Sequence, residues 1–365
     1  MANLPTSRSS EILDRLNAAA QRRRRSKLSL GLAGSISAGT QASYASDQRV
    51  WSKWAESQGI DALNYGPRDI ENWVVDQFDQ GLSRSIIERR VTALCWFAEK
   101  SGAPYPVDDK LRRTLKGLRR EKGLAPLRPA KPLTREILIK ALPPVPTVKP
   151  LMPYDALGSN TKIASSQKRY RVQLAARLSA LRDRAILLLG HASGIRGKYL
   201  SQLILTPVKR SEVNPLPELG FIEQGDERRI EITIHKSGTD PSVEGFSRII
   251  AETPDDPLCA VAAVRAWLDE AQITDGPVFR PISRGGAVGR VNAQGKINPI
   301  TTQLIAITVK QAAKRAGEDP AIFSGHSLRA GFVTDLLDAG VGLFTVADAV
   351  GHRQLATTKK YDRRA

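Results

Sequence analysis

The sequence has few cysteines and no long apolar run. Its two cysteines, Cys95 and Cys259, both stand inside apolar helical patterns, which favours buried thiols over a disulfide or a metal site. No apolar run approaches the roughly 18 residues that span a bilayer. The first residues, MANLPTSRSSEILDRLN, lack the apolar core of a signal peptide. We therefore expect a cytoplasmic protein.

Acidic residues are also scarce relative to basic ones. The 365 residues include 55 basic and 37 acidic side chains, which gives a net charge of +18. A non-membrane protein this basic is expected to bind a polyanion, and nucleic acid is the leading candidate because the charge is spread along the whole chain. The alternative is a generic solubilising surface. Binding to nucleic acid would associate the protein with the nucleoid.

The length suits two domains of roughly 100 to 200 residues each. Residues 1–36 predict a flexible basic segment whose arginine run either binds phosphates or forms a solvated tail. Residues 37–123 have helical periodicity throughout and predict a bundle of four or five helices. Residues 124–134 form a proline-rich connector, the best domain boundary. Residues 135–365 would then form the larger, second domain.

The second domain is predicted to be mainly helical with one small sheet. The segments RIEITIH and FSRIIAE predict an antiparallel hairpin. A strongly apolar helix is expected around RDRAILLLGHASG, after a second proline-rich stretch at 143–160 that predicts a surface loop. Further helices are expected at 258–271, 301–316, 326–339 and 343–350. The fold class is therefore mainly α with a small antiparallel sheet.

One helix of the first domain allows a prediction of individual core residues. The segment SRSIIERRVTALCWFAEKSG begins at a serine cap, ends at Gly102, and is expected to bury Ile86, Leu94 and Phe97.

Two basic motifs of the second domain could bind an anion. In SGHSLRAGF, His326 and Arg329 stand three residues apart at the start of a predicted helix and project from the same face. In ASGIRGKYL, Arg196 follows a glycine at the end of a buried helix, where a phosphate would suit its guanidinium. A helix cap with a surface arginine, and an internal carboxylate partner for Arg196, are the structural alternatives.

The last candidates lie in a turn and at the end of the sequence. Lys236 stands near the tip of the predicted hairpin, although turn lysines are common. In AVGHRQLATTKKYDRR, Gly351 predicts a helix end, His352 a turn, and Tyr361 a last short helix. A break after the glycine would allow His352 and Tyr361 to face one site, whereas one continuous helix would turn them apart.

The order Arg, Lys, His-x-x-Arg, Gly-His, Tyr resembles the tyrosine recombinase (phage integrase) family. The resemblance covers most of the chain, with residues 40–125 similar to the helical, SAM-like core-binding domain and 133–361 similar to the catalytic domain. It implies a two-domain clamp around duplex DNA, site-specific recombination through a 3′-phosphotyrosine, strand exchange through a Holliday junction, and a homotetramer on two DNA sites. Mobile-element integration, excision and resolution all remain open.

The resemblance also implies a role for each candidate residue. Arg196 and Arg329 would hold the non-bridging phosphate oxygens and stabilise the charge of the pentacoordinate state. Tyr361 would be the nucleophile, and His326 would assist its proton transfer. Lys236 would protonate the leaving 5′ oxygen, and His352 would donate a hydrogen bond to the phosphate. The arginines would replace a divalent metal ion, so we expect no metal ion and no cofactor.

The sequence departs from the family pattern at three places. Tyr199 stands where the family usually has an acidic residue, three positions after the first arginine. The segment HKSGTD allows a second alignment, which puts Gly238 at the lysine position. Many members carry a helix after the tyrosine that docks on a neighbouring subunit, whereas four residues follow Tyr361 in this sequence. The chain is either shortened or its subunits interlock by another route.

DNA contacts in the first domain are predicted at two helix N-termini, which suit grooves or phosphates. The candidates are Thr40, Gln41, Ser83, Arg84 and Arg89. A solvated helix face is the alternative.

Two other functions fit the same residues. A type IB topoisomerase uses this constellation to nick and swivel DNA without exchanging partners. A DNA-binding protein that has lost turnover would be consistent with Tyr199 and the short C-terminus. A metal-dependent nuclease is a weaker candidate, because four scattered histidines do not form a metal site.

Overall fold

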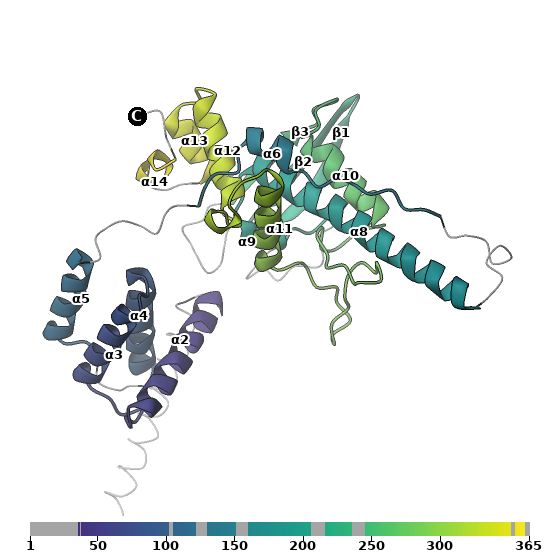
Figure 1. The fold of residues 1–365 in the computed structure, drawn as a ribbon. Helices are drawn as coiled ribbons and strands as arrows, with labels where there is room; N and C mark the ends of the chain where they lie inside the picture. Colours follow the sequence, from purple (N-terminus) through teal and green to yellow (C-terminus); the bar gives the residue numbers. More distant parts are fainter. Residues whose placement is uncertain are drawn as a thin grey trace, which may run out of the picture. The chain divides into compact units, whose positions relative to one another are not determined.

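The computed structural model describes residue 36 and residues 38–101, 105–121, 130–150, 160–205, 216–235, 245–351 and 355–361. The chain divides into two compact units, Met1–Arg128 and Pro129–Ala365, and this division lies within the proline-rich connector. Helices dominate both units, and the described strands form one three-stranded antiparallel sheet (Figure 1). The predicted fold class is therefore confirmed.

The first unit is a helical bundle. Its described helices are α2 (Ala38–Ser57), α3 (Pro67–Asp79), α4 (Arg84–Ser101) and α5 (Asp109–Glu121), within the predicted four or five. Helix α3 begins with Pro67. Proline suits this position because the N–H groups of the first helical turn have no partner within the helix, so the N–H that proline lacks costs no hydrogen bond. Trp51 and Trp73 pack edge to face in the core, with ring centroids 5.1 Å apart.

Helix α4 corrects one of the predicted core positions. Ile87 is buried, whereas Ile86 is half-buried. Helix α4 begins at Arg84, and its buried residues Ile87, Val91 and Leu94 are spaced by four and three positions, as expected for one helix face. Leu94 is buried as expected, and Phe97 is half-buried.

The second unit combines a sheet with helices. The strands β1 (Glu218–Gln224), β2 (Glu227–Ile234) and β3 (Phe246–Ala251) pair in that order, so the predicted hairpin of β2 and β3 is confirmed and β1 extends it. Ile230, Ile232 and Ile234 alternate along β2 and are buried in the core of this unit.

The helices of the second unit match most of the predicted segments. They are α6 (Arg135–Ala141), α8 (Asn160–Ser193), α9 (Gly197–Ser201), α10 (Ala260–Glu270), α11 (Thr302–Arg315), α12 (Ser327–Asp338), α13 (Leu343–Val350) and α14 (Leu355–Lys359), with a 3₁₀ turn at Pro320–Ile322. The four helices predicted between 258 and 350 are confirmed within two residues. Helix α8 is much longer than its predicted apolar part, and α6 was not predicted. In the second proline-rich stretch, residues 143–150 are neither helix nor strand, and 151–159 lie outside the described residues.

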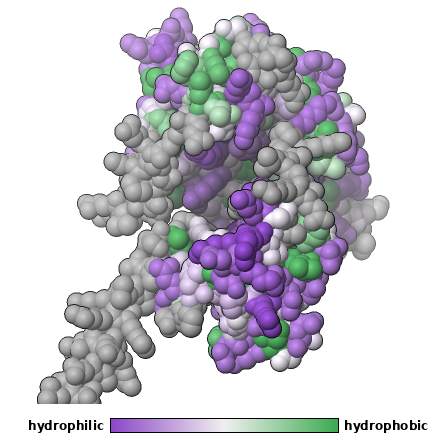
Figure 2. Space-filling view, turned by 90° about the vertical axis from the view of Figure 1, so that its left-hand side faces the viewer, coloured by the Kyte–Doolittle hydropathy of each residue, from purple (hydrophilic) through white to green (hydrophobic). Residues whose placement is uncertain are grey.

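The face drawn in Figure 2 is mainly hydrophilic where its residues are coloured. In Figure 2 the hydrophobic residues form small separate groups among the hydrophilic ones. The large apolar side chains that are most exposed, Leu63 and Phe344, belong to different units. Among the described helices, none combines the length and apolar character that a membrane crossing requires.

The first residues of the second unit lie against the start of helix α12. The backbone N–H groups of Lys131 and Leu133 donate to the carbonyl oxygens of Ile322 and Ser327, each at 2.9 Å. Gly331 of α12 meets this segment so closely that a Cβ atom there would lie 2.0 Å from the carbonyl oxygen of Leu133. Only glycine allows this approach, which fixes α12 against the segment.

A second set of contacts holds the same segment further along α12. One carboxylate oxygen of Asp335 accepts a hydrogen bond from the backbone N–H of Arg135 at 2.7 Å. The same oxygen lies 2.8 Å from Nε2 of His191, on α8. Helix α12 is therefore attached to the start of the unit and to α8.

Candidate active site

Arg196 lies in the turn between α8 and α9. Gly194 ends α8 with a positive φ of 61°, and the ring of Phe332 occupies the place where a side chain would begin. The following Ile195 is buried and fixes the turn against the core. Arg196 itself is exposed, and its side chain forms no hydrogen bond or ion pair with any residue that the structure describes. Its guanidinium is therefore available to a ligand.

Arg329 is held beneath the surface by two backbone carbonyl groups. It is 3% exposed, and its terminal nitrogens donate to the carbonyl oxygen of Gly194 at 2.8 Å and to that of Val350. Burial, and next the nearby charge of Arg196, lower the pKa of Arg329 to about 10. The group still carries its charge at neutral pH. The two bonds use two of its five N–H donors and fix its orientation.

Tyr361 follows the short helix α14 and folds back toward α12. Gly351 ends α13 in the left-handed conformation at φ 65°, which confirms the predicted helix end. The tyrosine ring packs against a small apolar cluster that includes Val333, Val346 and Val350. Its hydroxyl lies 3.0 Å from Nε2 of His326. The phenol of this chain therefore reaches the histidine of the same chain.

The acid–base properties of this pair are complementary. Burial raises the pKa of Tyr361, and nearby Arg329 opposes that shift. Although His326 is exposed overall, burial of its imidazole lowers its pKa, and Arg329 and Arg196 act in the same direction. Near neutral pH the phenol is therefore protonated and the imidazole is neutral. In the tautomer with its proton on Nδ1, the imidazole accepts the hydroxyl proton at Nε2.

The geometry brings together four of the six predicted catalytic residues. His326 and Tyr361 are hydrogen-bonded, and the charges of Arg196 and Arg329 act on this pair. The other two, Lys236 and His352, lie outside the described residues.

Two further residues stand close to Arg329. Tyr199 is half-buried against the core, and the phenol at this position raises the pKa of Arg329, against the larger effect of burial. Arg248 of β3 acts on the pKa of Arg329 in the opposite direction, and its guanidinium lies 4.9 Å from the ring centre of Phe246. The sequence analysis predicted the strand but did not name Arg248 as a residue near the site. Only the pairing of β3 with β2 could have suggested on which side of the sheet Arg248 lies.

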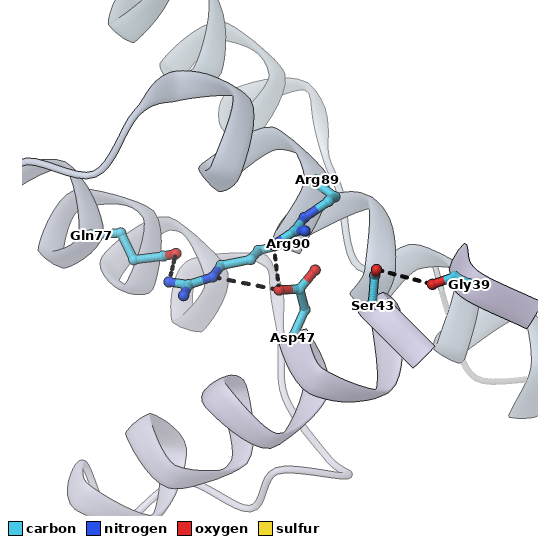
Figure 3. Close-up of polar contacts among 6 residues, drawn as sticks. All are labelled: Gly39, Ser43, Asp47, Gln77, Arg89 and Arg90. Atoms are coloured by element: carbon cyan, nitrogen blue, oxygen red, sulfur yellow. Dashed lines mark hydrogen bonds and ion pairs between the residues drawn. The ribbon is translucent and has the colours of Figure 1, made fainter. Parts of the chain in front are cut away.

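The predicted DNA contact Arg89 forms part of an ionic group around the buried Asp47 in the first unit (Figure 3). Asp47 of α2 is 3% exposed, and one of its oxygens lies 2.9 Å from Arg89 and 3.7 Å from Nε of Arg90. Arg90 also donates to the buried amide of Gln77 at 2.7 Å and so connects three helices. Arg89 points outward with 48% of its side chain exposed. Asp47 thus holds one structural arginine and one that is presented to solvent.

The other predicted DNA contacts lie on either side of this group. Helices α2 and α4 are antiparallel, since the ring of Tyr44 lies tilted beside that of Trp96 with ring centroids 5.9 Å apart, while Asp47 meets the earlier Arg89. The helix N-termini therefore lie at opposite ends of the pair. They carry the remaining candidates: Thr40 and Gln41 on α2, and Ser83 and Arg84 at the start of α4, where Arg84 is paired with Glu88 at 3.1 Å.

Cys259 is buried and Cys95 is half-buried, and both thiols are free. Within the described ranges, no group of three or more histidine, cysteine, aspartate or glutamate residues is arranged to hold a metal ion.

The chain is similar to known integrases and recombinases. Residues 257–365 match the sequence profile of the phage integrase family. The chain is 28% identical to an integrase/recombinase xerD homolog of Selenomonas ruminantium, over 87% of this chain and 79% of that protein. It is 24% identical to the tyrosine recombinase XerD of Chlorobaculum tepidum, over 91% and 88%. The integrase of transposon Tn1549, solved with transposon right end DNA, aligns over 95% of this chain and 93% of that one at 17% identity and a TM-score of 0.47.

The helical fold with its small sheet, the paired phenol and imidazole, and these relatives define the class of protein. The chain is a tyrosine-type site-specific recombinase. Its residues 257–365 form a phage integrase family domain.

Proposed function

We propose that the chain cleaves and rejoins DNA through a 3′-phosphotyrosine formed by Tyr361. The observation that carries this proposal is the 3.0 Å contact between the Tyr361 hydroxyl and Nε2 of His326, next to the buried cation Arg329. A phosphodiester is anionic and cleaves very slowly, so its cleavage needs both an activated nucleophile and a positive site for the developing charge. The net charge of +18 and the family of the chain support DNA as the substrate.

The reaction can be written from the residues of this chain. The phenol oxygen of Tyr361 attacks the phosphorus, and its proton passes to Nε2 of His326. Arg196 and Arg329 hold the non-bridging oxygens and stabilise the pentacoordinate state. The bond from phosphorus to the 5′ oxygen breaks, and Lys236 protonates that oxygen, while His352 donates a hydrogen bond to the phosphate. The new ester conserves the energy of the broken bond, so the reverse attack by a 5′ hydroxyl rejoins the strand without ATP.

The wider assembly belongs to the same proposal. Residues 37–123 form the core-binding DNA-binding domain, 124–134 the linker and 135–365 the catalytic domain, behind a flexible basic segment at 1–36. Thr40, Gln41, Ser83, Arg84 and Arg89 contact the DNA. Four subunits on two DNA sites exchange strands through a Holliday junction. With DNA as the substrate, the enzyme acts at the nucleoid.

Trapping of a covalent intermediate tests the proposal. The substrate is DNA that flanks the gene, chosen for inverted repeats around a short spacer, and nicked so that the cleaved strand escapes. The wild-type chain should form a protein–DNA adduct and Tyr361→Phe should form none, at equal DNA affinity. No adduct with the wild-type chain would leave a DNA-binding protein without turnover, which the phenol of Tyr199 in place of a carboxylate would then explain.

A second assay separates recombination from relaxation. Two sites of different length are placed on supercoiled DNA, and the products are resolved by size. A recombinase yields hybrid products, whereas a topoisomerase only relaxes the substrate. Adduct formation and relaxation without any hybrid product would refute strand exchange.

A further inference from the structure

The coil between α10 and α11 belongs to a stretch without acidic residues. Residues 276–317 contain no aspartate or glutamate, although the average of the chain would place about four there. The same stretch contains seven basic residues: Arg280, Arg284, Arg290, Lys296, Lys310, Lys314 and Arg315. In Figure 1 this coil extends beyond the end of α11. The mechanism described above uses none of it.

The base of the coil is firmly built. Arg280 is 8% exposed and donates to the carbonyl oxygen of Pro277 at 3.0 Å and to that of Asp275. The backbone N–H of Ile300 donates to the carbonyl oxygen of Phe279 at 3.1 Å, which brings the two ends of the coil together. These hydrogen bonds therefore hold the base of the coil in place.

Its outer part, residues 290–298, is a small hairpin. Val291 and Ile297 form an antiparallel bridge. The backbone N–H of Asn292 donates to the carbonyl oxygen of Lys296 at 2.8 Å. The side-chain oxygen of Asn292 also accepts from the backbone N–H of Lys296 at 2.9 Å and from that of Gln294 at 3.0 Å, so it closes the tip.

The register of this hairpin places its basic and amide side chains on the same face. Side chains alternate between the two faces of a strand, and residues opposite each other share a face. The bridge between residues 291 and 297 sets Arg290 opposite Asn298 and Asn292 opposite Lys296. These four side chains therefore share one face, and the two asparagine amides are joined on it at 3.3 Å. Two cations and two amides make a face that suits an anionic partner.

The cations of the hairpin have no acidic partner within the described parts of the chain. Arg290 and Lys296 are exposed, and neither forms an ion pair there. The hairpin leads directly into α11, whose Ala306 lies 3.8 Å from the position of a Cβ on Gly325, the residue before His326. The first turns of α11 thus connect the basic face to the candidate active site.

We propose that the hairpin at residues 290–298 is an additional DNA-binding element, in which Arg290 and Lys296 contact the phosphate backbone of the duplex held at the active site. The inference rests on the proposed function, since it takes the substrate of that site as its partner. Exposed cations without carboxylate partners release counterions when they bind phosphates, and a two-stranded ribbon has the width of a DNA major groove.

The salt dependence of DNA binding tests this element. The full chain and its Arg290→Ala/Lys296→Ala variant are titrated with a mixed-sequence duplex at several salt concentrations. Two lost phosphate contacts should reduce the slope of log K against log salt by about 1.8. Lys140→Ala/Arg229→Ala removes the same charge from an exposed and a half-buried side chain that both have carboxylate partners, and should keep the slope of the wild-type chain. Arg290→Glu/Lys296→Glu should weaken binding further.

The outcomes separate this inference from the proposed function. Equal thermal unfolding midpoints show that the variants are folded. An unchanged slope and affinity in both hairpin variants, with adduct formation at Tyr361 intact, would overturn the hairpin element and leave the catalytic proposal standing. Equal losses in the hairpin and control variants would also overturn it, because net charge alone would then explain the effect. A reduced slope in a chain that forms no adduct would support the hairpin and refute the catalysis.

Discussion

The contact between Gly331 and the start of the second unit makes a sharp prediction for Gly331→Ala. The new Cβ would lie 2.0 Å from the carbonyl oxygen of Leu133 and 3.2 Å from the ring of His191. A carbon and an oxygen need about 3.3 Å, so α12 must move by roughly 1 Å or the segment must detach. Overpacking of this kind destabilises a fold by about 1 to 3 kcal/mol.

The same movement should reach Arg329. Arg329 stands two residues earlier, about 200° around the helix, so it lies on the side opposite Gly331. Relief of the clash moves α12 toward the carbonyl groups of Gly194 and Val350, which hold the guanidinium. A misplacement of about 1 Å at a catalytic group can reduce the rate by about 100-fold. We therefore expect slower adduct formation at nearly unchanged DNA affinity.

Single-turnover adduct formation on the nicked substrate measures the rate, and equilibrium titration measures the affinity. Gly342→Ala is the matched control, because it makes the same change in the same unit and the nearest atom to its Cβ is 3.8 Å away. Wild-type rate and stability for Gly331→Ala would refute the reasoning. A loss of stability with a wild-type adduct rate would show that the packing of α12 against Leu133 does not control Arg329.

Three further predictions concern other parts of the chain. Asp47→Asn removes a negative charge and so makes the chain more basic, yet it should weaken DNA binding by about fivefold because Arg89 loses its orienting partner. Exposed Asp79→Asn should have no such effect in the same titration, and tighter binding by Asp47→Asn would contradict the prediction. The decline of adduct formation at acid pH should have its midpoint below pH 6.5, the ordinary pKa of histidine, because His326 has a lowered pKa and must be neutral to accept the proton. His326→Gln should abolish this acid limb, and a midpoint above pH 6.5 in the wild-type chain would argue against the role. Gly117→Ala, in a helix where nothing lies within 4 Å of the new atom, should stabilise the first unit by about 1 kcal/mol in denaturant unfolding, and a loss would contradict the open surface.

Local signals located most of the helices correctly. Proline at the start of α3 and glycine after α13 mark real helix ends, because they act through backbone geometry that is fixed at the residue itself. The assignment of Ile86 to the core was wrong by one position, since the burial of a helix face depends on its rotation against neighbours. The polar first half of α8 gave no apolar period, so its length could not be predicted.

The sequence by itself determined which residue types the site contains and their order along the chain. It could not determine that Arg329 is buried, because its partners are the carbonyl oxygens of Gly194 and Val350, 135 and 21 residues away. Nor could it determine that Tyr361 reaches His326, because that contact needs the chain to turn after Gly351 and pack against α12. Local composition fixes what each segment can do, whereas only packing between distant segments decides which groups meet and how strongly their pKa values are shifted.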